Sequence, residues 1–422
     1  MYTIEETKKI YISKNNNYFK KNFFILIVGK LLSELGSSIF SFALSLYILD
    51  LTGSAQIFSV ILSFSLLPTC LVNLFLGGFV DNNNQKKIMV LADCINGIVI
   101  FIYLTLFTFM PENILLIGIV IVIVNSIRAL FSLALNSSIP ELVGQANVMK
   151  SNSFIQGITP AVHMVGPVIG AILYENIGIE IIILLNASLF ICSSILEGFF
   201  KFEYQKKKKE IKKLKKNFYL IVRYLKNNRT FSNILLFALV VNGIFLPQML
   251  LGVPYVSYNI IDVTPIQLSF IETASALGSV IGVFFVAWYK NNNILLKYFF
   301  KLLKIQAVLI MLFSFSYFFQ LNNGNKWMAT LVFSILVFVI QGLNMIQNVP
   351  LFTYFQLTIP KEIRGRIIGV AFAALYISPP IGMLIYGSLF EWFQSSYVFI
   401  GTGVVLIVLC NIASKKINLI SN

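Results

Sequence analysis

The chain contains twelve runs of mostly apolar residues, each long enough to cross a lipid bilayer as a helix. A transmembrane helix needs about 20 such residues. Inside the bilayer every backbone polar group must also be paired within the structure, and a helix meets this need by itself. The sequence therefore predicts an all-α integral membrane protein with twelve transmembrane helices, at residues 23–49, 55–79, 88–110, 113–135, 151–173, 178–200, 231–258, 267–289, 295–320, 327–350, 367–389 and 396–413.

The basic residues are distributed unevenly between the two sides of the membrane. With residue 1 in the cytoplasm, nearly all of the 32 Lys and Arg residues lie before the first run or in loops on that side. The outer loops carry only Lys326, together with acids such as Asp50 and Glu112. Cytoplasmic loops of membrane proteins show this excess, so both termini are predicted to be cytoplasmic. The same bias accounts for the net charge of +15 without a nucleic-acid partner.

A basic connection divides the runs into two sets of six. The domain organisation that we expect is a cytoplasmic segment at residues 1–22, a six-helix bundle at 23–200, a basic linker at 201–230, a second six-helix bundle at 231–413 and a cytoplasmic tail at 414–422. The linker is either an amphipathic helix on anionic lipid headgroups or a solvated connection. PVIG at 167–170 is matched by PPIG at 379–382, in the fifth run of each set, which favours a duplicated transporter fold.

The composition argues against several other functions. No GxxxxGK[ST] motif is present for binding a nucleoside triphosphate. The single His and the four Cys, which form no CxxC pair, cannot build a metal cluster. We therefore expect no enzymatic activity, no metal and no cofactor.

Two motifs carry a resemblance to a known family. Residues 77–87 read GGFVDNNNQKK, in the loop between the second and third runs, and residues 166–171 read GPVIGA, in the fifth run. They resemble the G-x-x-x-D-R-x-x-R-K signature of the major facilitator superfamily and the G-P-x-x-G-G motif of its exporters. SIPELV at 138–143 and IP at 359–360 are similar to the macrolide-efflux branch, which also contains siderophore exporters.

The resemblance implies a role in conformational change for both motifs. In the first, Asp81 beside the Gly77-Gly78 pair would form a cytoplasmic latch with residues 364–366, to which Lys86 and Lys87 contribute. The alternative is that Asp81 only caps the loop. In the second, the helix bends at Gly166, Pro167 and Gly170, although any close-packed helix can carry such a motif. The sequence departs from the first pattern at Asn82 and Gln85, where arginines are usual, and from the second at Ala171. The residues that we assign to conformational control are Gly77, Gly78, Asp81, Lys86, Lys87, Asp93, Gly166, Pro167, Gly170, Arg364, Gly365 and Arg366.

Charged residues within the runs are candidates for coupling or substrate sites. A charge at the centre of a transmembrane helix costs about 2.5–3.5 kcal/mol. Lys30 and Glu34 are four residues apart, hence on one helical face. Glu34 is predicted to exchange a proton for substrate, the alternative being a structural pair with Lys30. Arg128 in the fourth run could pair with Glu34 or with an anionic substrate group.

Other polar residues within the runs are less clearly assigned. His163 is either a proton-transfer group or a packed histidine, and Glu272 is either a second site or an interfacial acid. Asp93 and Glu197 are assigned to cytoplasmic charge networks. The amides of the seventh and tenth runs are candidates to line a cavity: Asn242, Gln248, Asn344 and Gln347.

Taken together, these features predict a secondary transporter that works by alternating access. We expect export of a small amphipathic compound in exchange for protons, with the proton gradient as energy source and no cofactor. Macrolide-like drugs and a drug/proton antiporter mechanism are implied by the resemblance alone. The alternatives are export of an endogenous siderophore, lipid or peptide, or a non-transporting membrane receptor or scaffold. The expected setting is a monomer in the lipid bilayer of a bacterial inner or plasma membrane.

Overall fold

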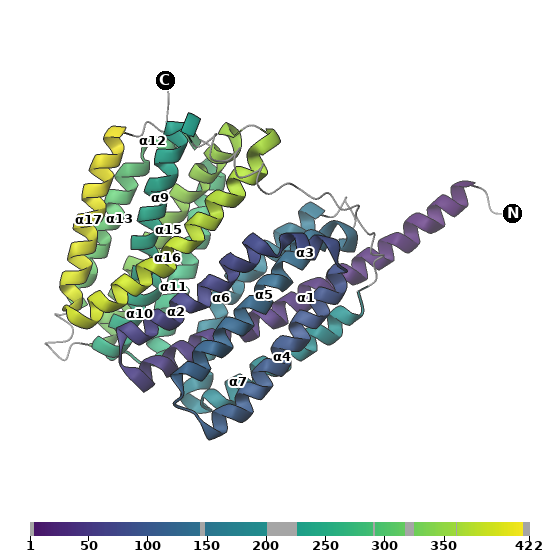
Figure 1. Ribbon diagram of the computed structural model, residues 1–422, viewed down its shortest axis with the longest axis horizontal. Helices are drawn as coiled ribbons and strands as arrows, with labels where there is room; N and C mark the ends of the chain where they lie inside the picture. Colours follow the sequence, from purple (N-terminus) through teal and green to yellow (C-terminus); the bar gives the residue numbers. More distant parts are fainter. Residues whose placement is uncertain are drawn as a thin grey trace. The chain divides into compact units, whose positions relative to one another are not determined.

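A computed structural model describes residues 4–143, 148–200, 226–289, 292–316, 325–359 and 361–416, and all regular elements in these ranges are helical (Figure 1). Ten of these helices are long and apolar enough to cross a membrane. The predicted runs at 295–320 and 367–389 are not among the ten, but helices occupy the described parts of both. Each of the twelve predicted runs therefore coincides with helical residues.

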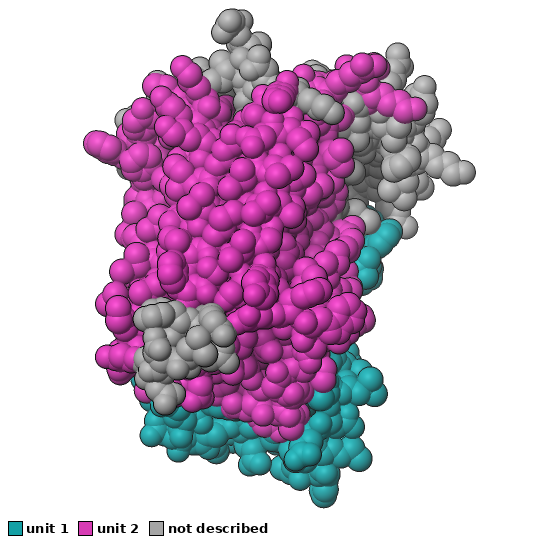
Figure 2. Space-filling view, turned by 90° about the vertical axis from the view of Figure 1, so that its left-hand side faces the viewer, with its two compact units in different colours: residues 1–44, 71–209 teal, residues 45–70, 210–422 magenta. Residues whose placement is uncertain are grey.

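The chain is divided by its contacts into two compact units, coloured separately in Figure 2. Unit 1 comprises residues 1–44 and 71–209, and unit 2 comprises residues 45–70 and 210–422. This division differs from the sequence-based one, because the end of the first long helix and most of the second are grouped with unit 2. The predicted boundaries of the two six-helix bundles stay a prediction.

Unit 1 is built from long helices that run side by side and one short helix, α3 (Figure 1). They are α1 (Ile4–Thr52) up to residue 44, α3 (Gly77–Asn82), α4 (Gln85–Phe109), α5 (Ile114–Val143), α6 (Val148–Asn176) and α7 (Ile179–Gly198). Helix α4 packs against both α5 and α7. Its buried residues recur every three or four positions, as for one helical face: Met89, Ala92, Asp93, Asn96, Gly97, Ile100, Tyr103 and Phe107.

Unit 2 contains the remaining helices. They are α2 (Ala55–Phe75) up to residue 70, α9 (Arg229–Pro247), α10 (Val253–Tyr255), α11 (Pro265–Tyr289), α12 (Asn292–Lys297), α13 (Phe299–Leu312), a 3₁₀ turn (Phe313–Phe315), α15 (Lys326–Thr358), α16 (Lys361–Trp392) and α17 (Ser395–Lys416). The closest packing joins α11 to α15. There Gly278 lies against the backbone of Phe338, and Gly282 lies against that of Gly342. Small residues permit such close contact between helices in a membrane.

Two π-helical segments follow α9. Residues Gln248–Gly252 and Val256–Ile260 adopt this wider geometry, on either side of the short α10. Pro247 ends α9, and Pro254 lies in α10. Because proline lacks a backbone N–H and clashes with the preceding turn, it disturbs the ordinary α-helical pairing. We attribute the departure from α-helix at this point to the two prolines.

Hydrogen bonds explain why residues 45–70 belong to unit 2. The Tyr258 hydroxyl donates to Asp50 Oδ1 at 2.7 Å. The Ser54 hydroxyl donates to Glu391 Oε2 at 3.0 Å. The Ser63 hydroxyl donates to the carbonyl of Pro380 at 3.0 Å. These contacts tie the end of α1 and the helix α2 to unit 2, a grouping that helix periodicity cannot reveal.

Candidate functional site

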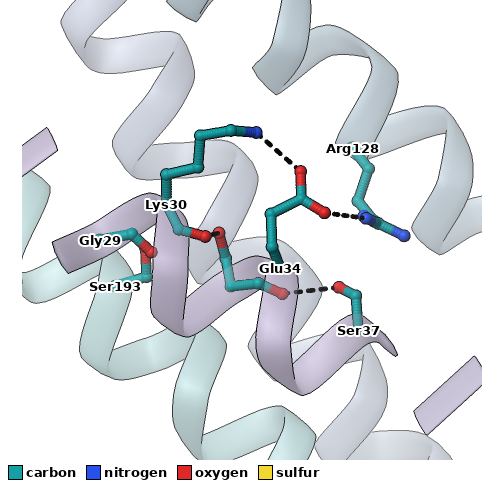
Figure 3. A network of polar contacts seen from close by, with 7 residues as sticks. Gly29, Lys30, Glu34, Ser37, Arg128 and Ser193 are labelled. Atoms are coloured by element: carbon teal, nitrogen blue, oxygen red, sulfur yellow. Dashed lines mark hydrogen bonds and ion pairs between the residues drawn. The ribbon is translucent and has the colours of Figure 1, made fainter. Parts of the chain in front are cut away.

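A cluster of three charged side chains lies within unit 1 (Figure 3). Lys30 Nζ lies 2.7 Å from Glu34 Oε1, and Arg128 Nη2 lies 3.2 Å from Glu34 Oε2. Lys30 and Glu34 come from α1 and are four residues apart, while Arg128 comes from α5. The pairing of Arg128 with Glu34, one of the two possibilities raised by the sequence, is present in the structure.

The charges of this cluster do not balance. One carboxylate faces two cations, and each of its oxygens contacts a different cation. The side chains of Lys30, Glu34 and Arg128 are 11%, 20% and 32% exposed, so water screens them only in part. For Glu34 to accept a proton, at least one ion pair has to open. Both ion pairs of the cluster therefore depend on the negative charge of Glu34.

Serine hydroxyls line the same stretch of α1. Ser33 donates to the carbonyl of Lys30 at 3.3 Å, and Ser37 donates to the carbonyl of Ser33 at 2.7 Å. From α7, the Ser193 hydroxyl donates to the carbonyl of Gly29 at 3.0 Å (Figure 3). This last bond connects α7 to α1 at the residue directly before Lys30.

His163 does not join the cluster by a direct bond. Its side chain is exposed, and among the described residues no hydrogen bond or ion pair joins it to Glu34. It interacts with the Glu34 carboxylate electrostatically, without contact. A role for His163 in proton transfer stays a prediction.

The GPVIGA segment lies where α6 approaches α1. A Cβ added to Gly166 would collide with the Ser38 side chain. A Cβ at Gly170 would lie 3.2 Å from the carbonyl oxygen of Ile39. The glycines of the motif thus permit close helix packing, as the sequence indicated.

We expect Gly166→Ala to destabilise unit 1 by about 1–3 kcal/mol, the usual cost of overpacking. The obstacle is the Ser38 side chain rather than backbone. Ser38→Gly combined with Gly166→Ala should therefore recover most of the lost stability, as measured by thermal unfolding of the purified protein in detergent. An equally unstable double variant would contradict this account of the contact.

An apolar groove of about 500 Å³ lies on unit 1 between α1 and α6. Its lining is almost entirely aliphatic and aromatic: Leu31, Leu35, Phe154, Gly157, Ile158, Ala161, Val162 and Val165. Leu31 and Leu35 follow Lys30 and Glu34 directly in the chain. The groove therefore adjoins the segment of α1 that carries the charged cluster.

Unit 2 contains a smaller and more polar cavity of about 270 Å³. Three of the four amide residues singled out in the sequence line it, namely Asn242, Asn344 and Gln347. Gln248 does not, because it is fully buried and donates to the Thr402 hydroxyl at 3.3 Å. Phe237, Tyr376 and other aromatic and aliphatic residues complete the lining. Amide groups beside aromatic rings suit a ligand with both polar and apolar parts.

Glu272 belongs to unit 2 and lies on α11, half-buried. One turn further along α11, Ser275 accepts a hydrogen bond from Gln341 Nε2 of α15 at 3.2 Å. The assignment of Glu272, as a second site or as an interfacial acid, stays a prediction.

The residues of the predicted cytoplasmic latch are described only in part. The side chains of Gly77, Gly78, Asp81 and residues 364–366 lie outside the described ones, so the latch stays a prediction. The backbone of residues 77–82 forms the short helix α3, within the segment 77–87 that the sequence placed in a loop. Lys86 donates to the carbonyl of Phe200 at 2.7 Å, and the exposed Lys87 has its backbone N–H bonded to Asn84 Oδ1.

Two acids are buried more deeply than the sequence suggested. Asp93 of α4 and Glu197 of α7 are each 1% exposed, where we expected members of a cytoplasmic charge network. Both lie near Ser193 of α7, whose hydroxyl donates to the carbonyl of Gly29. A signal was present in the sequence, because Asp93 and Asn96 fall on one helical face, as do Ser193 and Glu197. Spacing alone, however, does not say whether a helical face is buried.

The model of the Major Facilitator Superfamily matches residues 26–383, which is most of the chain. The chain belongs to this superfamily. It is a multi-pass membrane transporter, and its fold is that of the superfamily, with twelve transmembrane helices in two six-helix bundles. The fold class and the resemblance stated from the sequence are confirmed, and the family and its relatives indicate a membrane transporter rather than an enzyme.

Several bacterial members of the superfamily are similar to this chain in sequence. Macrolide efflux protein A of Streptococcus pyogenes is 23% identical over 402 residues, covering 94% of this chain and 96% of that protein. The uncharacterized MFS-type transporter YkuC of Bacillus subtilis is 30% identical over 179 residues, covering 42% of this chain and 41% of that protein. The similarity to the efflux protein thus extends over nearly the whole of both chains.

Solved superfamily structures share the fold at low sequence identity. The nucleoside transporter NupG aligns with a TM-score of 0.73 at 13% identity, covering 93% of this chain and 98% of that one. A bacterial homologue of the iron transporter ferroportin, in an inward-facing state, aligns with a TM-score of 0.69 at 13% identity, covering 93% of this chain and 98% of that one. At these identities the match concerns the fold alone.

Proposed function

We propose that this superfamily member exports small amphipathic compounds in exchange for protons by alternating access. The observation that carries the proposal is Glu34, a carboxylate within a membrane-spanning helix whose two oxygens hold two different cations. An acid placed in this way can couple its own protonation to a change of local structure. The whole-length similarity to a protein named for macrolide efflux supports export as the direction.

The proposed cycle follows the charge of Glu34. A proton from the outer side binds a Glu34 oxygen and neutralises it, so that Lys30 and Arg128 lose their shared partner. Helices α1 and α5 are then free to separate at this point, and the site opens to the cytoplasm. Loss of the proton to the cytoplasm restores the carboxylate and both ion pairs. Substrate then binds the deprotonated site from the cytoplasm and leaves the cell in the opposite step, which returns the site to the outer side.

The unit 2 cavity supports a substrate with polar and apolar parts. At about 270 Å³ it is just below the usual range for small-molecule pockets, about 300–1,000 Å³. It suits one ring or sugar-sized part of a larger compound, with Asn242 and Asn344 offering hydrogen bonds. Macrolide-like drugs are the leading candidates, on the strength of the relatives' names.

The proposed setting is a bacterial inner or plasma membrane, with both termini in the cytoplasm. The excess of Lys and Arg on the predicted inner side supports this orientation. The proton gradient would supply the energy without a cofactor. We propose a monomer with the lipid bilayer and a small substrate as its partners, and no nucleic acid.

The experiment is substrate-triggered proton movement in inside-out membrane vesicles with an acidified lumen. We expect at least one compound from a panel of macrolides, cationic dyes and siderophores to release protons from the lumen, reported by a pH-sensitive dye. Vesicles without the protein and vesicles with the exposed-acid variant Glu175→Gln serve as controls. A response that needs a sodium gradient, or none from any compound with correctly inserted protein, would contradict the proposal.

A further inference from the structure

Asp93 and Glu197 form an acidic pair in the interior of unit 1 that the Glu34 cycle does not use. Asp93 lies on α4 and Glu197 on α7, two helices that pack along each other. Both side chains are 1% exposed. Among the described residues, Asp93 Oδ2 and Glu197 Oε2 are buried without a hydrogen-bond partner. Two buried carboxylates with unpaired oxygens are costly, because burial and mutual repulsion both disfavour two negative charges.

No cation within ion-pair distance offsets these charges in the described part of the chain. The charged groups that act on Asp93 from a distance are Lys30 and Glu34 of α1 and Arg128 of α5. Both cations are already paired with Glu34. Lys86, at the start of α4, donates to the carbonyl of Phe200. Among the described residues, no cation is therefore placed to neutralise the pair.

The Ser193 hydroxyl indicates what neutralises the pair. Ser193 lies near both acids, and its hydroxyl donates to the carbonyl of Gly29 at 3.0 Å. A hydroxyl has one hydrogen, so with that hydrogen on Gly29 its oxygen can only accept from the acids. A carboxyl group donates a hydrogen bond only when it carries a proton. The arrangement is satisfied when one of the two acids is protonated.

Asn96 indicates independently that the interface between α4 and α7 holds a water molecule or a proton. It lies one turn after Asp93 on α4, is 0% exposed, and neither its amide oxygen nor its amide nitrogen has a partner among the described residues. At the next residue, Gly97, a Cβ would collide with Ile191 of α7. The interface between α4 and α7 is therefore closely packed around polar groups that have no partner among the described residues. Such an arrangement is typical of a site that holds a proton or water.

We propose that Asp93 and Glu197 share one proton and form a second proton site of the transporter, connected to Glu34 through Ser193 and α1. Its part in transport rests on the proposed proton-coupled function. A Cβ at Gly29 would lie 3.6 Å from Glu197 Oε1, so this carboxyl lies directly against α1. A movement of α1 that opens the Arg128–Glu34 pair also moves Gly29 from Ser193 and uncovers Glu197. The proton then passes from the carboxyl O–H to water and leaves the pair doubly ionised.

The first test detects the proton itself, by infrared spectroscopy of the full-length protein in lipid at neutral pH. In the wild type we expect a C=O stretching band from a protonated carboxyl group. This band should be absent in the double variant Asp93→Asn/Glu197→Gln. In each single variant, the remaining acid should lose its proton at a lower pH than the wild-type pair loses its shared proton. The reason is that the neighbouring carboxyl group, which repels a negative charge, has been removed. Glu180→Gln, which removes an exposed acid from the same helix, should leave the band unchanged.

Several results would overturn the shared proton site. They are a band that survives in the double variant, single variants that titrate as wild type does, or a band removed by sodium or magnesium at constant pH, which would indicate a cation site. If the double variant does not fold, Ser193→Ala keeps both acids and should shift the band frequency, since the protonated carboxyl loses its acceptor. An unshifted band there would contradict the arrangement.

The second test separates this site from the proposed function. In the vesicle assay, the double variant should lose substrate-triggered proton release although wild type shows it. Release equal to wild type would overturn a role for the pair in coupling and leave proton-coupled export standing. A wild type that moves no protons, with the infrared bands as expected, would remove the proposed function and support the proton site.

Discussion

Glu34→Gln is expected to abolish substrate-triggered proton release and to destabilise the protein. The substitution removes the titratable group and leaves Lys30 and Arg128 without their shared partner. Breaking a buried ion pair from one side costs about 3–5 kcal/mol, and we expect the lower end because Arg128 is 32% exposed. Proton flux in vesicles and thermal unfolding in detergent measure the two effects separately.

A double variant distinguishes a coupling role from a purely structural one. Lys30→Met combined with Glu34→Gln removes a cation together with the acid, and should recover part of the lost stability. If Glu34 carries the proton, transport stays at background in this variant despite the recovered fold. Recovery of proton-coupled transport along with stability would assign Glu34 to a structural pair only.

Gly278→Ala is expected to destabilise unit 2 by roughly 3 kcal/mol, at the upper end of the cost of overpacking. The added Cβ would collide with the carbonyl group and Cα of Phe338, all of them backbone atoms of α15. Unlike the Ser38 side chain opposite Gly166, this backbone cannot move aside without separating α11 from α15. A lower unfolding temperature and less monodisperse protein in size-exclusion chromatography are the expected observations.

Gly401→Ala is the matched control for this prediction. Gly401 lies in α17 of the same unit, and nothing lies within 4 Å of a Cβ added there. Alanine has the higher helix propensity, by about 1 kcal/mol, so this variant should be neutral or slightly stabilising. Equal losses in both variants would show that helix packing at Gly278 is not the cause.

The sequence predicted those features that depend on local spacing. Runs of about 20 apolar residues located the helices, because bilayer thickness fixes their length. The four-residue spacing of Lys30 and Glu34 predicted their contact, because such residues lie on one helical face. The GPVIGA segment predicted close packing of α6, which the approach of Gly166 to Ser38 shows.

What the sequence did not predict depends on which helix faces pack together. Asp93 and Glu197 were assigned to the cytoplasmic side from their position near helix ends, yet the packing of α4 on α7 buries both. The grouping of residues 45–70 with unit 2 rests on hydrogen bonds between residues more than 200 positions apart, such as that from Tyr258 to Asp50. No local pattern contains such information.

The two π-helical segments after α9 have a consequence for the history of this chain. A π-turn accommodates one residue more than the α-helical turn that it replaces. It can therefore arise from a single-residue insertion without rotating the helix on either side. Relatives that lack one of these segments should carry a one-residue deletion between Gln248 and Ile260, with α10 and the flanking helices otherwise in register. Such deletions would mark the branch of the superfamily in which this helix acquired its present form.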